Sequence, residues 1–227
     1  MKRVLWFFLT VSILLIMLLY AKHGHQGVSA YGFLSYAFLY DVRTGVRIQM
    51  TEDPVAYMGL ITLYSIGILY MTSTASALQR SFVPFVMGRL RGRGGLVTWS
   101  MRSVLGSGAR FTSAFVLAVL LCSVVLFHTV STIDSRQLWM LAVQLFLTLS
   151  WLGHAAFYAN MKYGRFTAVV SGIVIIAAFF PLATAFGGVS VLIFSGHRAM
   201  QWGVLVSIVL YMATALSLRL GLANIDI

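Results

Sequence analysis

Six predominantly apolar stretches of this sequence run for 17 residues or more without an Asp, Glu, Lys or Arg side chain. A helix crosses the hydrocarbon core of a bilayer in about 20 apolar residues, because the core is about 30 Å thick. In lipid the backbone polar groups must be paired within the segment, so each stretch is expected to be helical. The sequence therefore predicts an all-α membrane protein with six transmembrane helices: Val4–Tyr20, Val55–Leu78, Phe111–Val130, Leu138–Met161, Phe166–Phe186 and Trp202–Leu218.

The composition excludes a soluble domain. Of the 227 residues, 60% are hydrophobic and 9% are charged, whereas soluble domains are about 45–50% apolar and about 25% charged. So few charged side chains cannot cover a water-facing surface of this size. We expect one transmembrane domain over residues 1–227.

The first stretch has a second interpretation. Lys2 and Arg3 precede an apolar run, as in a secretory signal, and Val28-Ser29-Ala30 is an acceptable cleavage site. The run is longer than the usual signal core of about 7–15 residues, and the candidate site lies ten residues beyond it. These lengths favour an uncleaved helix over a cleaved signal.

The net charge of +11 is distributed unevenly between the two sides of the predicted membrane. With the N-terminus in the cytoplasm, the inner segments hold eleven of the sixteen basic residues and one of the five acidic ones. That distribution places +10 inside and +1 outside. An excess of Lys and Arg marks cytoplasmic segments, so both termini are predicted to be cytoplasmic. The charge is explained by topology, and no nucleic-acid partner is expected.

Most of the inner charge lies in one segment, residues 79–110, which carries six arginines and no acidic residue. We expect a cytoplasmic loop that contains an amphipathic helix, lying on the membrane surface or leading into the third span. The apolar positions Val97, Met101, Val104 and Leu105 follow helical spacing, and Ser100, Ser103 and Ser107 are expected largely on the opposite side. Two roles remain open for this segment: an anchor on anionic lipid, or a docking element for a cytoplasmic partner.

The second span ends in a run of small residues, which allow helix backbones to approach closely in lipid. We therefore predict a tight helix contact near the inner face, within the chain or across a dimer, at Ser73, Ala75, Ser76 and Ala77.

The spans offer few side chains that could act in catalysis or bind a metal. His128 and His154 are the only histidines within them. These two lie in opposite leaflets, so a shared metal or haem is not expected. Ser150 and His154 are four residues apart on one helix face, but the sequence has no G-x-S-x-G turn to expose a nucleophile. Cys122 is the only cysteine. We predict no catalytic, cofactor or metal site, and expect His154 to be a hydrogen-bonded helix contact.

This layout resembles the permease subunits of ABC-2-type exporters, and most closely the small permeases that accompany bacterial bacteriocin and antimicrobial-peptide systems. The resemblance covers the whole chain in topology. Its motif is a basic stretch after the second span with arginines, a tryptophan and a further basic residue, here Arg89, Arg91, Arg93, Trp99 and Arg102. Arg102 stands where that pattern has lysine, and Gly94-Gly95 lengthens the spacer.

The resemblance implies a multi-pass subunit in the bacterial cytoplasmic membrane that forms a homodimer or heterodimer and binds a separate soluble ABC ATPase. Segment 79–110 would contact that ATPase, and ATP-driven closure would rock the helices between inward-facing and outward-facing states. The uncharged spans favour an amphipathic or hydrophobic cargo, such as a peptide or a lipid-like molecule, because a charged cargo calls for counter-charges within the membrane.

Two other functional classes are alternatives. One is a non-transporting membrane protein, such as an immunity or assembly factor that binds a partner through the basic segment. The other is an intramembrane enzyme that uses His154.

Overall fold

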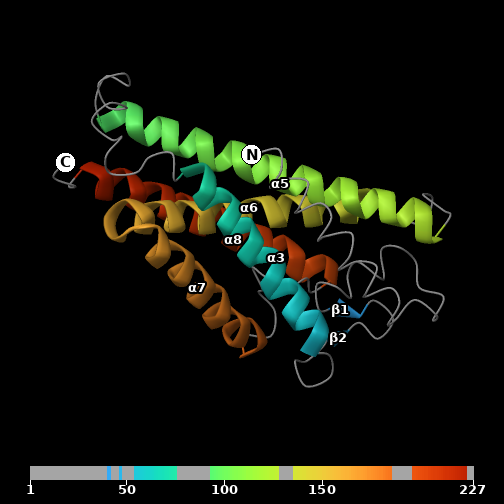
Figure 1. The fold of residues 1–227 in the computed structure, drawn as a ribbon. Coiled ribbons are helices and arrows are strands. Elements are labelled where there is room, and N and C mark those ends of the chain that lie inside the picture. Colours follow the sequence, from blue (N-terminus) through green and yellow to red (C-terminus); the bar gives the residue numbers. More distant parts are fainter. Residues whose placement is uncertain are drawn as a thin grey trace.

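The computed structural model describes residues 40–41, 46–47, 54–75, 93–127, 135–185 and 196–223. Over this part the protein is a bundle of helices with one short antiparallel pairing, in which β1 (Tyr40–Asp41) meets β2 (Val46–Arg47). The described helices are α3 (Pro54–Ala75), α5 (Arg93–Phe127), α6 (Ser135–Tyr163), α7 (Arg165–Ala185) and α8 (Gly196–Ala223) (Figure 1). The predicted span Val4–Tyr20 lies outside the described residues.

Five of the six predicted spans coincide with these helices. The predicted span 55–78 corresponds to α3 and 138–161 to α6, and the last two spans correspond to α7 and α8. The third, 111–130, is the second half of α5, which begins already at Arg93. The expected helix of the basic segment therefore leads directly into the third span, and residues 93–110 are helical rather than a loop.

Helix α6 is the centre of the bundle. It packs against all four other helices, which follow one another around it in the order α7, α3, α5 and α8. Its apolar stretch Trp139–Tyr163 is long and uncharged enough to cross a membrane, and most of that stretch is buried by the neighbouring helices. Among the described residues, α3, α7 and α8 have shorter apolar stretches: Met58–Thr72, Phe166–Phe179 and Trp202–Ser217.

Glycines set the closest helix approaches in the bundle. A Cβ atom at Gly67 of α3 would lie 2.6 Å from Cδ2 of Leu149. One at Gly172 of α7 would lie 2.9 Å from Cδ1 of Ile68. At Gly153 of α6, a Cβ atom would overlap the sulfur of Met71. Small residues let helix backbones approach in this way, so these glycines fix how α3, α6 and α7 pack.

A single residue joins α6 to α7. Gly164 has a φ of 95°, a left-handed conformation that glycine adopts without the steric cost met by other residues. Its N–H donates to the carbonyl of Asn160 at 3.0 Å, and its carbonyl accepts the N–H of Ala168 at 3.1 Å. The backbone of Gly164 therefore pairs with polar groups at the end of α6 and at the start of α7. The chain reverses its direction at this residue (Figure 1).

The first half of α5 does not have the polar face that its sequence pattern predicts. Ser100 is fully buried and Ser107 is 3% exposed, on the same side as Val97 and Val104. The expectation that these serines lie opposite the apolar residues was wrong. A serine is small and can satisfy its hydroxyl on its own helix, as Ser100 does by donating to the carbonyl of Val97 at 2.7 Å. It therefore fits into a tight helix contact.

Helices α5 and α6 run side by side with a definite register. A Cβ atom at Gly153 would lie 2.9 Å from Cγ1 of Val104, and one at Gly108 would lie 3.4 Å from Oγ of Ser150. Because the helices are antiparallel, Phe111 of α5 lies level with the middle of α6.

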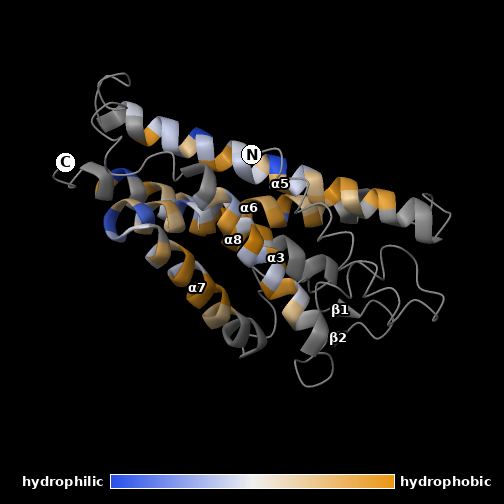
Figure 2. Ribbon diagram, viewed as in Figure 1, coloured by the Kyte–Doolittle hydropathy of each residue, from blue (hydrophilic) through white to orange (hydrophobic). Residues whose placement is uncertain are grey.

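The outward faces of α7 and α8 are apolar. Exposed side chains on α7 include Phe166, Val170, Ile173 and Val174, and those on α8 include Trp202, Leu205, Val209, Met212, Leu216 and Leu220. Figure 2 shows hydrophobic residues along α7 beyond its more polar N-terminal end. Apolar patches of this extent mark surfaces that meet a partner or a membrane rather than water.

Candidate functional site

Helix α6 carries four buried polar side chains into the centre of the bundle: Gln144, Thr148, Ser150 and His154. Polar groups removed from water need hydrogen-bond partners. Thr148 shares a side-chain hydrogen bond with Tyr64 of α3. The Ser150 hydroxyl donates to the carbonyl of Phe146 at 2.7 Å. These residues use their polar groups for helix contacts and for satisfying the backbone.

His154 is different because only one of its ring nitrogens has a partner. The residue is fully buried, and its Nδ1 lies 2.7 Å from the carbonyl oxygen of Ser150. A carbonyl only accepts, so Nδ1 carries the proton and, in the neutral ring, Nε2 is an acceptor. Nε2 is buried without a hydrogen-bond partner among the described residues.

The ring of His154 faces α8. It meets the ring of Tyr211 edge to face, with the ring centroids 5.3 Å apart. One turn earlier on the same face of α8, Ser207 is fully buried, and its hydroxyl also lacks a partner among the described residues. The junction of α6 and α8 thus holds an unused acceptor and an unused hydroxyl. We define His154, Ser207 and Tyr211 as the α6–α8 polar junction.

The α6–α8 polar junction can hold a hydrogen-bonding group, but Ser150 and His154 do not form a nucleophile and base. A catalytic pair requires the hydroxyl to bond to the ring nitrogen, and here the hydroxyl of Ser150 bonds to the backbone instead. His154 makes its hydrogen bond within α6 and meets α8 through its ring contact with Tyr211. No group of three His, Cys, Asp or Glu side chains occurs among the described residues, and His154 alone does not define a metal site.

Replacing His154 by phenylalanine tests the junction. The ring contact with Tyr211 is retained, while the unpartnered Nε2 is removed. An unsatisfied buried group costs about 1–3 kcal/mol, so the thermal unfolding temperature of the purified variant is expected to equal or exceed that of the parent chain. A fall of several degrees would contradict this expectation and show that the hydrogen bonds of the imidazole stabilise the bundle.

Only part of the predicted docking element lies within the described side chains. Arg89 and Arg91 lie outside the described residues, and Arg93 is the first residue of α5, with its side chain not described. Trp99 is half-buried and Arg102 is exposed on the same helix. Trp99 and Arg102 therefore both lie in the N-terminal part of α5.

The predicted packing residues at the end of α3 are not tested. Ser73 and Ala75 belong to α3, but their side chains are not described, and Ser76 and Ala77 lie outside the described residues. The close contacts that the structure does show occur earlier, at Gly67, and on other helices. A glycine inside an apolar span is a signal for such contacts, and sequence reasoning missed these glycines.

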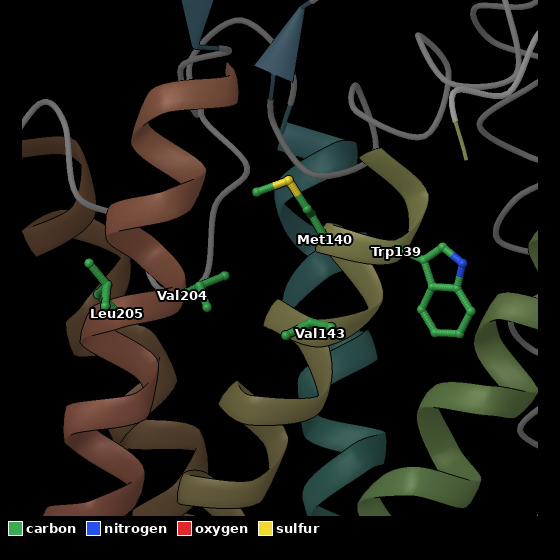
Figure 3. Close-up of a pocket in the computed structure, with 5 residues that line it drawn as sticks. All are labelled: Trp139, Met140, Val143, Val204 and Leu205. Carbon is green, nitrogen blue, oxygen red and sulfur yellow. The ribbon is translucent and has the colours of Figure 1, made fainter. Parts of the chain in front are cut away.

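An open groove lies between the N-terminal halves of α6 and α8. It encloses about 320 Å³ and is lined by Trp139, Met140, Val143, Val204 and Leu205 (Figure 3). This lining can accept a hydrocarbon chain, but it supplies no charged group that would orient a ligand. Comparison with models of protein families, with curated proteins and with solved structures gives no match.

Proposed function

We propose that the chain is a multi-pass membrane protein with six spans and both termini in the cytoplasm. The apolar outward faces of α7 and α8 support this proposal, because lipid covers such surfaces. The charge distribution supports it as well. The start of α5, the end of α6, the start of α7 and the end of α8 lie at one end of the bundle (Figure 1). The basic residues Arg93, Lys162, Arg165 and Arg219 lie near these helix ends.

Within that membrane setting, the chain acts as the permease subunit of an ATP-driven exporter of the ABC-2 type. It works as a homodimer or heterodimer with a separate soluble ATPase, and it moves an amphipathic or hydrophobic molecule such as a peptide or a lipid. One observation carries this proposal: α5 is a single helix of 35 residues that joins the basic docking segment to the central helix.

The continuity of α5 supplies a path for coupling. A force applied near Arg93 and Trp99 is transmitted along the helix to Val104, which contacts α6 beside Gly153. Because α6 packs against every other described helix, a tilt of α5 moves the whole bundle. Arg102 follows Trp99 by three residues on the same helix, so the proposed docking contact comprises Arg89, Arg91, Arg93, Trp99 and Arg102.

The test is reconstitution of the chain with a candidate soluble ABC ATPase. We expect the parent chain to co-purify with the ATPase and to stimulate ATP hydrolysis. Arg91→Glu is expected to weaken ATPase binding at least fivefold, because a docking charge contributes about 1 kcal/mol or more. The triple variant Arg89→Glu, Arg91→Glu, Arg93→Glu is expected to abolish it.

Arg219→Glu is the matched control, since it reverses one exposed arginine on α8. It is expected to leave ATPase binding within twofold of the parent chain. Equal losses in Arg91→Glu and Arg219→Glu would contradict a specific docking contact. If no ATPase binds the intact chain, the permease proposal fails and the immunity or assembly class takes its place.

A further inference from the structure

The α6–α8 polar junction holds two polar groups that are complementary but not paired. Nε2 of His154 is a hydrogen-bond acceptor, because Nδ1 carries the proton that is donated to the carbonyl of Ser150. The hydroxyl of Ser207 on α8 can donate a hydrogen bond. Both atoms are buried, and neither has a partner among the described residues. An acceptor and a donor thus lie on the two helices of one contact.

The hydroxyl of Ser207 is not used by its own helix. A hydroxyl inside a helix commonly donates to the carbonyl one turn earlier. Ser100 and Ser150 do so, and Thr214 does so on α8 itself, where its Oγ1 lies 2.9 Å from the carbonyl oxygen of Leu210. Ser207 is fully buried and makes no such bond. Its hydroxyl is therefore available to a group on another helix.

The row of α8 that contains Ser207 has one large side chain. Gly203, Ser207, Tyr211 and Ala215 are spaced by four residues, so they are neighbours along one side of the helix. The three small residues of this row are buried, and small residues let helix backbones approach closely. The large side chain is Tyr211, whose ring meets that of His154 with the centroids 5.3 Å apart. We call this arrangement the tyrosine register of α8 on α6.

Helix α8 is placed to move along α6. The two helices run in the same direction (Figure 1), since the early residues Val143 and Val204 line one groove and the later residues His154 and Tyr211 are in ring contact. Among the described helices, α8 packs mainly on α6 and to a smaller extent on α5. Its outward face is exposed and apolar. A displacement of α8 along its axis therefore disturbs few contacts besides those with α6.

A displacement of α8 by four residues exchanges the side chain that faces His154. Four residues correspond to about 6 Å along a helix axis. Movement of α8 by this distance towards its C-terminal end brings Ser207 level with His154 in place of Tyr211, so that the serine hydroxyl faces Nε2. Movement in the opposite direction brings Ala215, which has no side-chain donor. Only one direction therefore pairs the two buried groups.

We propose that α8 has a second register on α6, displaced by one helical turn towards its C-terminal end, in which the hydroxyl of Ser207 donates to Nε2 of His154. We call it the serine register. The two registers exchange a ring contact for a hydrogen bond, and one-turn shifts of packed elements are an established kind of conformational switch. The inference goes beyond the proposed function, since it requires no ATPase. In the proposed membrane orientation, the serine register carries Arg219 about 6 Å towards the cytoplasm.

The experiment traps the two registers with cysteine pairs in the full chain, after the single native cysteine, Cys122, has been replaced by alanine. Val143→Cys with Val204→Cys reports the tyrosine register, because both residues line the groove between α6 and α8 (Figure 3). Val143→Cys with Met200→Cys reports the serine register, because Met200 precedes Val204 by four residues. A short thiol-specific cross-linker joins each pair. We expect both products, with the Val204 product in at least threefold excess.

Two substitutions in the cross-linking background shift the balance in opposite directions. Tyr211→Ala removes the ring contact and keeps the serine hydroxyl, so the Met200 product is expected to rise at least threefold. Ser207→Ala removes the hydroxyl and keeps the ring contact, so the same product is expected to fall at least fivefold. Thr214→Ala is the matched control, because it removes a hydroxyl that bonds within α8. It is expected to leave the ratio of the two products within twofold of the parent.

An equal yield of the Met200 product with and without Ser207→Ala would overturn the serine register, and so would a Tyr211→Ala variant in which that yield does not rise. Nitrogen NMR of the unsubstituted chain, labelled in its histidines, is a second measurement that requires no variant to fold in the contact. The signals of His154, assigned by their absence in His154→Phe, are expected to show two environments of the neutral ring, one of them with Nε2 hydrogen-bonded. A single environment with Nε2 free of a hydrogen bond would equally overturn the proposal.

Discussion

Replacing Gly153 with leucine is expected to prevent α3, α5 and α6 from packing together. A Cβ atom at this position already overlaps the sulfur of Met71 and lies 2.9 Å from Cγ1 of Val104, and leucine adds three further carbon atoms. Overpacking of a close-packed interior costs about 1–3 kcal/mol and occasionally more. The thermal unfolding temperature of the purified chain is therefore expected to fall by at least about 5 °C.

Gly59→Leu is the control for this substitution. Gly59 lies on α3, and a Cβ atom there would meet no other atom within 4 Å. Its leucine variant is expected to unfold within about 2 °C of the parent chain, since side chains added in open space change stability little. Equal losses of stability in both variants would assign the effect at Gly153 to helix propensity or to membrane insertion. They would contradict a role for the contact of α6 with α3 and α5.

Removing the ring of Phe111 is expected to have the second large effect. This side chain is fully buried, and its ring lies 6.2 Å from that of Tyr70, measured between centroids. It also fills the space in front of Gly67, where a Cβ atom would lie 3.4 Å from the Phe111 ring. Phe→Ala substitutions in protein cores cost about 3–5 kcal/mol, from lost transfer energy and from the cavity that remains.

The size of the Phe111→Ala loss also reports on the surroundings of the bundle. If lipid surrounds the bundle, the transfer contribution to the lost free energy of unfolding is small, because the hydrocarbon outside is as apolar as the protein interior. The loss then comes mainly from the cavity. Phe166→Ala is the control, because Phe166 is 82% exposed and its removal creates no cavity. Equal losses of unfolding free energy in the two variants would contradict the packing of the Phe111 ring against α3.

The existence of the helices could be predicted from the sequence, because an uncharged apolar stretch has few other ways to satisfy its backbone. The start of α5 could not be placed as securely. Gly94, Gly95 and the neighbouring arginines have the composition of a loop, yet α5 already begins at Arg93. The faces of α5 were misassigned for the same reason, since the burial of Ser100 and Ser107 follows from a tight contact between helices distant in sequence.

The central position of α6 is partly indicated by the polar residues in its sequence. Gln144, Thr148 and His154 are polar residues within an apolar span, and such residues face the interior of a bundle. The ring contact of His154 with Tyr211 could not be found from spacing alone, because Tyr211 lies more than fifty positions later.

The one-residue link at Gly164 has a consequence for biosynthesis. With no loop between them, α6 and α7 emerge from the ribosome as consecutive apolar segments and have no polar stretch to pass across the membrane separately. In the proposed membrane setting they would enter the bilayer together as a helical hairpin. Lys162 and Arg165 flank the bend, and positive charges beside a span are retained on the cytoplasmic side. Such a hairpin would fix the orientation of the C-terminal part of the chain before α8 is synthesised.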